Sequence, residues 1–367
     1  MPLLLINCGS SSLKYELRDG RERVGGDTIR EVMSHAEATE EAIERLRDEG
    51  VLDRVEAVCH RVVHGGTHFV EPALIDEVAE RRLRELAELA PLHNARAVEA
   101  IVASRRLLGP DMPMVASFDT AFHAAMPERA ASYALPRDLA EKHSIRRYGF
   151  HGLAHRYMAE RSAEVGGGPS RLITLQLGAG CSAAAVSDGR SVDTSMGLTP
   201  LEGLVMATRS GDVDPALPAF LEEHEGIPPG EAERILNKDS GLKGVSGRSG
   251  DMRELLEAGD ERAELAIELF CYRARKYVGA YLAVLGGADA LVFGGGVGEN
   301  SPPVRRRICE GMGWCGIELD EERNELAIGK ELRIDAGGKV EVWVMLVDEA
   351  EVMARDAEAL LGGKEER

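Results

Sequence analysis

Two turns rich in small residues could bind phosphate groups. The first runs from Asn7 to Lys14 (NCGSSSLK), where several hydroxyl groups and backbone N–H groups lie close to a lysine. The second, Gly178-Ala179-Gly180, lies in the other half of the chain. Hydroxyl groups and backbone N–H groups at such turns bind phosphate oxygens. Alone, the first turn could be an ordinary serine-rich hairpin, but the second glycine turn favours a nucleotide site with two phosphate loops.

Two arginines, Arg61 and Arg209, could hold an anion whose negative charge is spread over several oxygens. Arg61 closes an apolar strand, and the ligand site of an α/β protein usually opens where strands end. Arg209 lies in the polar segment from Thr208 to Pro215 (TRSGDVDP). Each guanidinium group can bind two oxygens at once. Taken singly, each arginine is more often a surface salt-bridge partner.

His151 is the strongest candidate for a catalytic histidine. It lies between an aromatic residue and a glycine in the segment from Arg147 to Gly152 (RYGFHG), which is typical of a turn. For His60 and His93 we favour a structural role as hydrogen-bonded turn histidines. No spacing typical of a zinc site links these residues.

Two carboxylates and a glycine run follow predicted strands. Magnesium bound to a nucleotide needs one or two carboxylates, so Asp119 and Glu349 are candidates, although either could cap a helix instead. The run from Gly294 to Asn300 (GGGVGEN) reads as a glycine-rich turn. It lacks both the GxGxxG fingerprint and the GK[ST] ending of a P-loop. We interpret it as a flat wall for a purine.

Strands and helices in alternation must position these residues. A strand pair at 3–7 and 13–17 is followed in the second half by a similar strand, glycine turn and strand near 171–186, which indicates an internal duplication. The predicted N-caps are Ser34, Asn94 and Asp260. The other predicted strands are 55–63, 114–117, 290–293 and 340–347, and the predicted helices are 35–49, 76–90, 95–108, 260–285 and 349–361. This alternation favours a mixed α/β architecture.

Length and composition limit the class of protein. A chain of 367 residues exceeds what one hydrophobic core usually supports, so two domains are expected. The formal net charge of -19 disfavours nucleic acid or an anionic membrane as the main partner. The N-terminal apolar run has neither the basic region nor the cleavage site of a signal peptide. Six cysteines without CxxC spacing favour a reducing cytoplasm.

In this order, the segments resemble the acetate kinase family over nearly the whole chain. The matching stretches are Ile6–Lys14, His60–Gly66, Leu89–Asn94, Phe118–His123, Arg147–Gly152, Asp193–Gly203, Thr208–Pro215 and Gly298–Ser301. The resemblance implies a two-lobed, actin-like (ribonuclease H-like) α/β fold in which a duplicated mixed sheet is flanked by helices and the active site lies in the inter-lobe cleft. The expected lobes are residues 1–121 with 351–367, and residues 122–350.

The same resemblance implies reversible transfer of the γ-phosphoryl group of ATP to acetate, with magnesium as cofactor and a homodimer as the assembly. The implied catalytic residues are Arg61, Asp119, His151 and Arg209, supported by His93, and the implied metal ligands are Asn7 and Glu349. A pocket for the acyl group is expected from Val63, Leu92, Phe150 and Pro200. The expected nucleotide and phosphate contacts are Asn7, Ser10, Ser12, Lys14, Gly178, Ala179, Gly180, Gly294, Gly295, Gly296, Gly298, Glu299 and Asn300. Loss of Arg61 or Arg209 is expected to reduce activity with little loss of fold.

This chain departs from the family pattern beside the phosphates. Gln176 stands where the family usually has histidine, Ala179 where it has asparagine, and Gly294-Gly295 where it has Thr-Ala. These changes concern the nucleotide more than the acyl group. Two alternatives therefore stay open. One is a kinase for propionate or butyrate, or one that uses a different phosphoryl donor. The other is a catalytically weak protein that binds nucleotide as a sensor or scaffold.

Overall fold

A computed structural model describes residues 1–9, 11–89 and 94–362 of the chain. It divides into two compact units. Unit 1 comprises residues 1–124, 151–153 and 348–367, and unit 2 comprises residues 125–150 and 154–347. The lobe boundaries expected from the sequence stay a prediction. Within the described residues, no helix is both long enough and apolar enough to cross a membrane.

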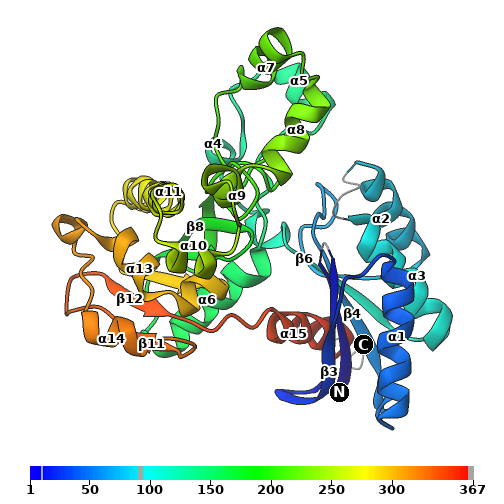
Figure 1. Ribbon diagram of the computed structural model, residues 1–367. Coiled ribbons are helices and arrows are strands. Elements are labelled where there is room, and N and C mark those ends of the chain that lie inside the picture. Colours follow the sequence, from blue (N-terminus) through cyan, green and yellow to red (C-terminus); the bar gives the residue numbers. More distant parts are fainter. Residues whose placement is uncertain (10, 90–93, 363–367) are drawn as a thin grey trace. The chain divides into compact units, whose positions relative to one another are not determined.

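Unit 1 is built on a mixed sheet whose strand order is β3-β2-β1-β4-β6-β5 (Figure 1). Strands β1, β4 and β6 run parallel to one another, whereas β2, β3 and β5 join antiparallel. The strands are β1 Pro2–Cys8, β2 Ser12–Asp19, β3 Glu22–Arg30, β4 Ala57–Val62, β5 Ala73–Leu74 and β6 Met114–Phe118. The helices of this unit are α1 His35–Asp48, η1 Leu52–Arg54, α2 Glu77–Leu89, α3 Asn94–Leu108, η2 Ala121–His123 and α15 Glu349–Gly362.

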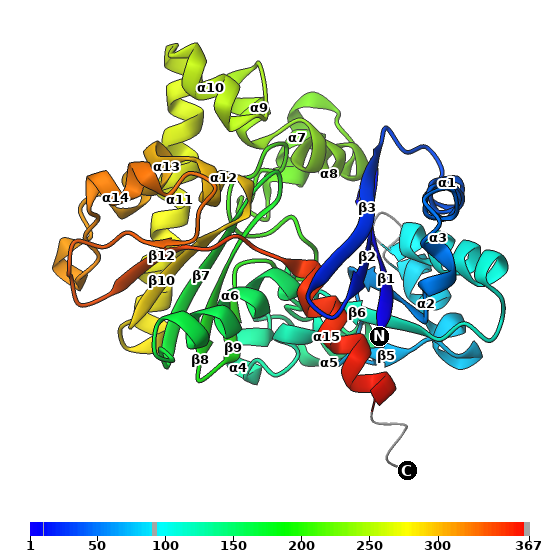
Figure 2. The same ribbon diagram turned by 90° about the horizontal axis from the view of Figure 1, so that it is seen from below.

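Apolar and charged side chains alternate along β2, and this pattern explains how helices cover both faces of the sheet. Leu13, Tyr15 and Leu17 point into the core that α1 and α3 close. Because successive side chains of a strand point to opposite faces, the charged side chains between and after them face the other way. That second face carries α15, which packs against β1, β4 and β6. Figures 1 and 2 both show α15 and the pair α1 and α3 on opposite sides of the sheet.

Unit 2 repeats the same topology in the described part of the chain. Its strand order is β9-β8-β7-β10-β12-β11, with β7, β10 and β12 parallel and the others antiparallel (Figure 2). The strands are β7 Arg171–Leu177, β8 Cys181–Ser187, β9 Arg190–Thr194, β10 Ala290–Gly294, β11 Leu332–Arg333 and β12 Glu341–Val344. The predicted duplicated mixed sheet flanked by helices is therefore confirmed.

The helices of unit 2 surround this second sheet. They are α4 Glu128–Ala131, α5 Arg137–Lys142, α6 Gly152–Val165, α7 Leu217–Glu225, α8 Pro229–Lys238, α9 Gly241–Ser246, α10 Met252–Ala258, α11 Glu261–Leu285, α12 Gly295–Asn300, α13 Pro302–Cys309, η3 Gly313–Cys315 and α14 Glu321–Leu326. Helix α6 begins with two residues that belong to unit 1. The long helix α11 packs against β7 and β8.

Several local predictions are confirmed and three are wrong. Ser34 and Asp260 cap α1 and α11 as expected, with side chains that accept from backbone N–H groups three residues on. Asn94 is not a cap, because its side chain binds both the backbone N–H and the carbonyl of His64. The glycine run after β10 is not a turn, because Gly295–Asn300 forms the short helix α12.

The third error concerns His60, which is not a turn histidine. It lies inside β4 with no exposed surface, and neither ring nitrogen is hydrogen-bonded to a described residue. Burial, reinforced by the positive charge of Arg105, lowers the pKa of His60 to about 3. The folded protein therefore holds this imidazole neutral.

We expect this neutral histidine to make the fold sensitive to acid. Below pH 6.5, the ordinary pKa of histidine, His60 is protonated in the unfolded chain but stays neutral in the folded protein. The free energy of unfolding therefore falls by about 1.4 kcal/mol per pH unit. His60→Leu should reduce the loss between pH 7 and pH 5 by about 2 kcal/mol. Urea unfolding at both pH values measures this, and the exposed His68→Gln should behave like wild type. An unchanged pH dependence in His60→Leu would contradict the assignment.

Candidate active site

The guanidinium group of Arg61 is the centre of a partly buried polar cluster in unit 1. Its Nε donates to Asp119 Oδ1 at 3.0 Å, and its Nη2 donates to Asp119 Oδ2 at 2.7 Å. Its Nη1 lies 3.1 Å from Glu349 Oε2 and donates to Asn7 Oδ1 at 3.2 Å. The amide of Asn7 closes the ring by donating to Glu349 Oε2 at 3.3 Å. One cation thus joins two carboxylates and a carboxamide.

Strand register brings these residues together from distant parts of the sequence. Ile6 of β1 pairs with His60 of β4, so Asn7 and Arg61 follow side by side. Val62 of β4 pairs with the last residue of β6, and Asp119 comes next. The carboxyl ends of parallel strands meet at one edge of a sheet. Glu349 is the first residue of α15, which packs across these same strands.

Burial and charge act against each other in this cluster. Burial by itself would lower the pKa of Arg61, but Asp119 and Glu349 more than offset it and the pKa is raised. Burial raises the pKa of Glu349, and the nearby charge of Arg61 reduces that rise. Only 1% of Asp119 is exposed. Charged groups buried in this way need their partners, because an unpaired buried charge is costly.

A glycine brings His151 next to this cluster. A Cβ atom on Gly152 would lie 1.9 Å from the backbone oxygen of Asp119, so only glycine fits there. His151 precedes it with φ of +56°, a left-handed conformation that a side chain other than glycine rarely adopts. Such strain is concentrated at functional sites. The close approach of Gly152 to the Asp119 backbone thus places the backbone of His151 near Asp119 within unit 1.

The first predicted phosphate loop lies beside the same cluster. Gly9 N donates to Ser12 O at 2.8 Å, which closes the turn between β1 and β2. Lys14 lies directly opposite Asn7 in the β1–β2 register, and its charge, like that of Arg61, reduces the rise that burial causes in the pKa of Glu349. Ser10, Leu92 and His93 were also predicted to belong to the site, but they lie outside the described residues. Val63, predicted for the acyl pocket, directly follows β4 and is partly buried.

Arg209 lies in a second group of predicted residues, within unit 2. Its Nη1 donates to Pro200 O at 2.6 Å, and among the described residues it forms no ion pair with a carboxylate. Burial accordingly lowers its pKa. The glycine turn lies close by, because Ala207 N donates to Ala179 O at 3.0 Å and the charge of Arg209 acts on Cys181. This group therefore has a desolvated cation beside the second predicted phosphate loop. Phe150, also predicted for the acyl pocket, is buried in the same unit.

The start of α12 lies against the end of β7, next to that loop. Gly295 has φ of +75°, and a Cβ atom there would lie 2.7 Å from Leu177 O. Glu299 Oε1 accepts from Gly295 N at 3.0 Å and from Val347 N at 3.1 Å. The carboxylate of Glu299 thus binds two backbone segments, at Gly295 and at Val347. Gly296, by contrast, has open space where a Cβ atom would be.

Sequence reasoning missed the residues that support the Arg209 segment. Tyr277 Oη of α11 donates to Asp212 Oδ2 at 2.8 Å, and Asp212 Oδ1 accepts from Gly203 N at 2.8 Å. Asp212 lies in the quoted motif TRSGDVDP, but no local signal identifies Tyr277 because α11 is distant in sequence. Sequence reasoning also missed the role of Gly152, although the glycines on either side of Phe150-His151 were a usable signal.

The site has the oxygen donors that magnesium prefers. Carboxylate and amide oxygens of Glu349, Asp119 and Asn7 meet around Arg61. Magnesium usually binds one or two protein carboxylates and completes its shell with water and phosphate oxygens. Among the described residues, no group of three or more His, Cys, Asp or Glu side chains could enclose a metal. The donor set therefore fits magnesium bound together with a nucleotide.

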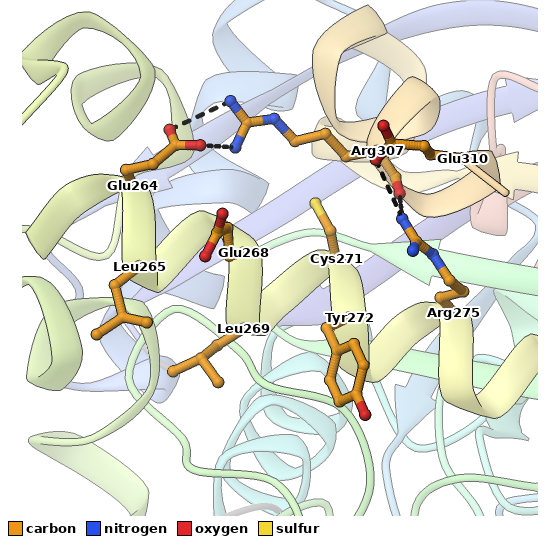
Figure 3. Close-up of a pocket in the computed structure, with 9 residues that line it drawn as sticks. All are labelled: Glu264, Leu265, Glu268, Leu269, Cys271, Tyr272, Arg275, Arg307 and Glu310. Atoms are coloured by element: carbon orange, nitrogen blue, oxygen red, sulfur yellow. Dashed lines mark hydrogen bonds and ion pairs between the residues drawn. The ribbon is translucent and has the colours of Figure 1, made fainter. Parts of the chain in front are cut away.

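A separate pocket lies elsewhere in unit 2. It measures about 480 Å³ between α11 and α13, and its lining includes Leu265, Cys271 and Tyr272 of α11 (Figure 3). Arg307 of α13 pairs there with Glu264 of α11. No residue predicted for the site lines this pocket.

Comparison with known proteins agrees with this fold. The duplicated sheets define an actin-like fold, and two solved structures match the chain with a TM-score of 0.92. One is acetate kinase from Porphyromonas gingivalis, 39% identical over 98% of this chain and 99% of that one. The other is a propionate kinase from Francisella tularensis, 36% identical over 97% and 98%.

The sequence comparisons place the chain in one family. The acetokinase family pattern matches residues 23–355. The acetate kinase of Chloroherpeton thalassium is 44% identical over 97% of this chain and 98% of its own length, and that of Dictyoglomus turgidum is 45% identical over 99% and 98%. This chain therefore belongs to the acetokinase family, as its motifs predicted.

The two arginines should differ in their importance for stability. Arg61→Ala leaves the buried Asp119 and the partly buried Glu349 without their cation, so we expect the free energy of unfolding to fall by about 3 kcal/mol. Arg209→Ala removes no described ion pair and should cost about 1 kcal/mol. Chemical denaturation of both variants measures the difference. Equal losses would contradict the cluster described above. From the sequence we expected little loss of fold for either change; the contacts of Arg61 lead us to expect a larger loss for that residue.

Proposed function

We propose that this chain is an acetate kinase, a phosphotransferase that transfers the γ-phosphoryl group of ATP to acetate and yields acetyl phosphate and ADP. The observation that carries the proposal is the partly buried Arg61 guanidinium, held by Asp119 and Glu349 where parallel strands end. Relatives named acetate kinase, 44% and 45% identical over nearly the whole chain, support it.

The chemistry needs no general base. A carboxylic acid with a pKa near ~4 is already ionised at neutral pH, so the acceptor oxygen can attack directly. Catalysis then consists of alignment and of neutralising charge on the transferring phosphoryl group. Arg61 would hold that group, and Asp119 would fix the orientation of the guanidinium. His151 would donate a hydrogen bond to a phosphoryl oxygen.

Arg209 would supply a second cation. A guanidinium group has five N–H donors, and Arg209 uses one of them on Pro200 O. Its lack of a described carboxylate partner leaves its charge available for the acceptor or the phosphoryl group. Arg61 and Arg209 therefore have different tasks, because the first is already neutralised by carboxylates and the second is not.

Magnesium and ATP would bind to the donor sets already described. Glu349 and Asn7 would hold Mg²⁺, which neutralises phosphate charge when bound. Ser10, Ser12 and Lys14 would bind phosphate oxygens from the first loop, and Gly178, Ala179 and Gly180 would do so with backbone N–H groups. The start of α12, where Gly296 offers an open surface, would border the adenosine.

The acyl group would fill an apolar pocket of Val63, Leu92, Phe150 and Pro200. A kinase with propionate as acceptor is the second candidate, because the propionate kinase structure matches this chain with the same TM-score as the acetate kinase structure, 0.92. Donor identity is a further question, since Gln176 and Ala179 flank the second loop. A nucleotide sensor without turnover is the alternative of another class.

We also propose that the enzyme is a homodimer in the cytoplasm. All six cysteines are free, which fits a reducing compartment. Light scattering after size exclusion tests the assembly.

A coupled assay tests the proposed reaction most simply. With acetate, Mg²⁺ and ATP we expect hydroxylamine to trap acetyl phosphate, and we expect Arg209→Ala to lower kcat/KM by about 10²–10³-fold, because it removes charge stabilisation from the transition state. Calorimetric titration of ATP on the same sample provides the control. Nucleotide binding without turnover on any short-chain acid or donor would favour the sensor instead.

Acceptor size provides a further prediction. Val63→Ala should raise kcat/KM for propionate relative to acetate by about 10-fold or more, since room for one methylene is worth about 1–3 kcal/mol. Steady-state kinetics with acetate, propionate and butyrate measure the ratio. If Val63→Ala left the ratio unchanged, Val63 would not line the acyl pocket.

A further inference from the structure

A second charged cluster in unit 1, centred on Arg18 and Glu16 of β2, lies beside the Arg61 cluster, and neither of these two residues has a role in the proposed chemistry. Arg18 of β2 is 9% exposed and Glu16 is 4% exposed. The Nε of Arg18 donates to Glu16 Oε1, and its Nη2 donates to Asp348 Oδ2 at 2.5 Å. Lys14 Nζ lies 3.9 Å from Glu16 Oε2. Charges alternate from Lys14 to Asp348 along one face of β2.

The burial of this cluster requires an explanation. Taking an arginine and a carboxylate out of water costs free energy, and an apolar pair of similar volume often serves the fold as well. The neighbouring inward positions of β2, Leu13, Tyr15 and Leu17, are apolar and pack in the core on the opposite face. The charged face is the one that meets the start of α15.

Asp348 links this cluster to Glu349. Asp348 directly precedes α15, and its Oδ1 accepts from Glu351 N at 3.1 Å, which is the hydrogen bond of an N-cap. Its other oxygen is held by Arg18. With both oxygens bound, Asp348 fixes where α15 begins. The first residue of that helix is Glu349, whose carboxylate must reach Asn7 and Arg61.

The residue before Asp348 is fixed as well. Val347 N donates to Glu299 Oε1, which also accepts from Gly295 N at the start of α12. The chain passes from unit 2 to unit 1 between Val347 and Asp348. The segment that carries Glu349 is thus anchored by hydrogen bonds on each side of this crossing.

The geometry points to Arg18 as a positioning residue: through its ion pair with Asp348 it sets the orientation of the Glu349 carboxylate for the divalent cation that accompanies the nucleotide. This inference rests on the proposed function. Among the described residues Arg18 is hydrogen-bonded to Glu16 and Asp348 and not to Glu349 or Arg61, so its effect passes through the helix start. Outer partners that orient a metal ligand typically change metal affinity by about 10–100-fold when they are removed.

The test compares variants that separate the ion pair from the helix cap. Arg18→Met removes the cation, and Asp348→Asn keeps an oxygen that can cap α15 but removes the charge that Arg18 binds. Arg18→Lys keeps the positive charge but lacks the planar guanidinium group that binds two carboxylates at once. The matched control is Arg45→Met, because Arg45 of α1 also bridges two carboxylates, Asp27 and Glu41, but on the exposed surface of the same unit.

Electron paramagnetic resonance measures Mn²⁺ binding to each variant with ADP present, and steady-state kinetics measure the dependence on Mg²⁺. We expect Arg18→Met and Asp348→Asn to raise the Kd for Mn²⁺ and the apparent KM for Mg²⁺ about tenfold, with KM for acetate within about twofold of wild type. Arg18→Lys should recover part of the loss, and Arg45→Met should match wild type.

Wild-type Mn²⁺ affinity and Mg²⁺ dependence in both Arg18→Met and Asp348→Asn would overturn the inference. If Arg18→Met does not fold, as judged by circular dichroism, Asp348→Asn decides alone. The proposed function fails in a different way, since wild type would then make no acetyl phosphate. Mn²⁺ binding with ADP needs no turnover, so it still reports on Arg18 in that case.

Discussion

A partly buried guanidinium group bound by two carboxylates is the constraint on which the rest of the site depends. Folding removes most of the water around Arg61, whose side chain stays 16% exposed, so Asp119 and Glu349 must replace the lost solvation. The two carboxylates in turn would repel each other without the cation between them. Each member therefore fixes the others, and the register of β1, β4 and β6 together with the start of α15 determines where the cluster lies.

The duplicated sheets show how one topology was adapted to two tasks. In β7 and β10, Gln176 pairs with Gly294, and this pair corresponds to Asn7 beside Arg61 in β1 and β4. Unit 1 thus has a carboxamide next to a cation, whereas unit 2 has a carboxamide next to a glycine. A Cβ atom at Gly294 would lie 2.6 Å from Val347 Cγ2, so a larger residue could not occupy that position without a shift. The first arrangement suits charge stabilisation and the second suits close approach of the backbone.

Much of the fold could be predicted from the sequence because local patterns decide it. The buried run of β1, the cap at Ser34 and the stop of α11 at Gly286 each have a local cause. The short strands β5 and β11 lack such a pattern, and tertiary pairing forms them. His60 was misinterpreted because its neighbours, a glycine turn and an arginine, suggested a turn, whereas the sheet buries it. Helix α12 was missed because glycine has low helix propensity.

The individual residues of the candidate site could be predicted from the sequence, but the hydrogen bonds and ion pairs between them could not. Motifs identified Asn7, Arg61, Asp119 and Glu349, yet neither of the two contacts that hold Glu349, with Arg61 and Asn7, follows from spacing. The role of Gly152 depends on its approach to the Asp119 backbone, and that of Arg18 on an aspartate 330 residues away. Such long-range contacts are set by the topology of the sheet and have no local signature.

The most direct test is a crystal structure with ADP, Mn²⁺, acetate and a planar metal fluoride, which mimics the transferring phosphoryl group. Our account predicts anomalous density for the metal at the carboxylate of Glu349 and hydrogen bonds from Arg61 to the fluoride while Asp119 still holds the guanidinium group. A metal bound away from Glu349, with Arg61 making no contact to the fluoride, would contradict it.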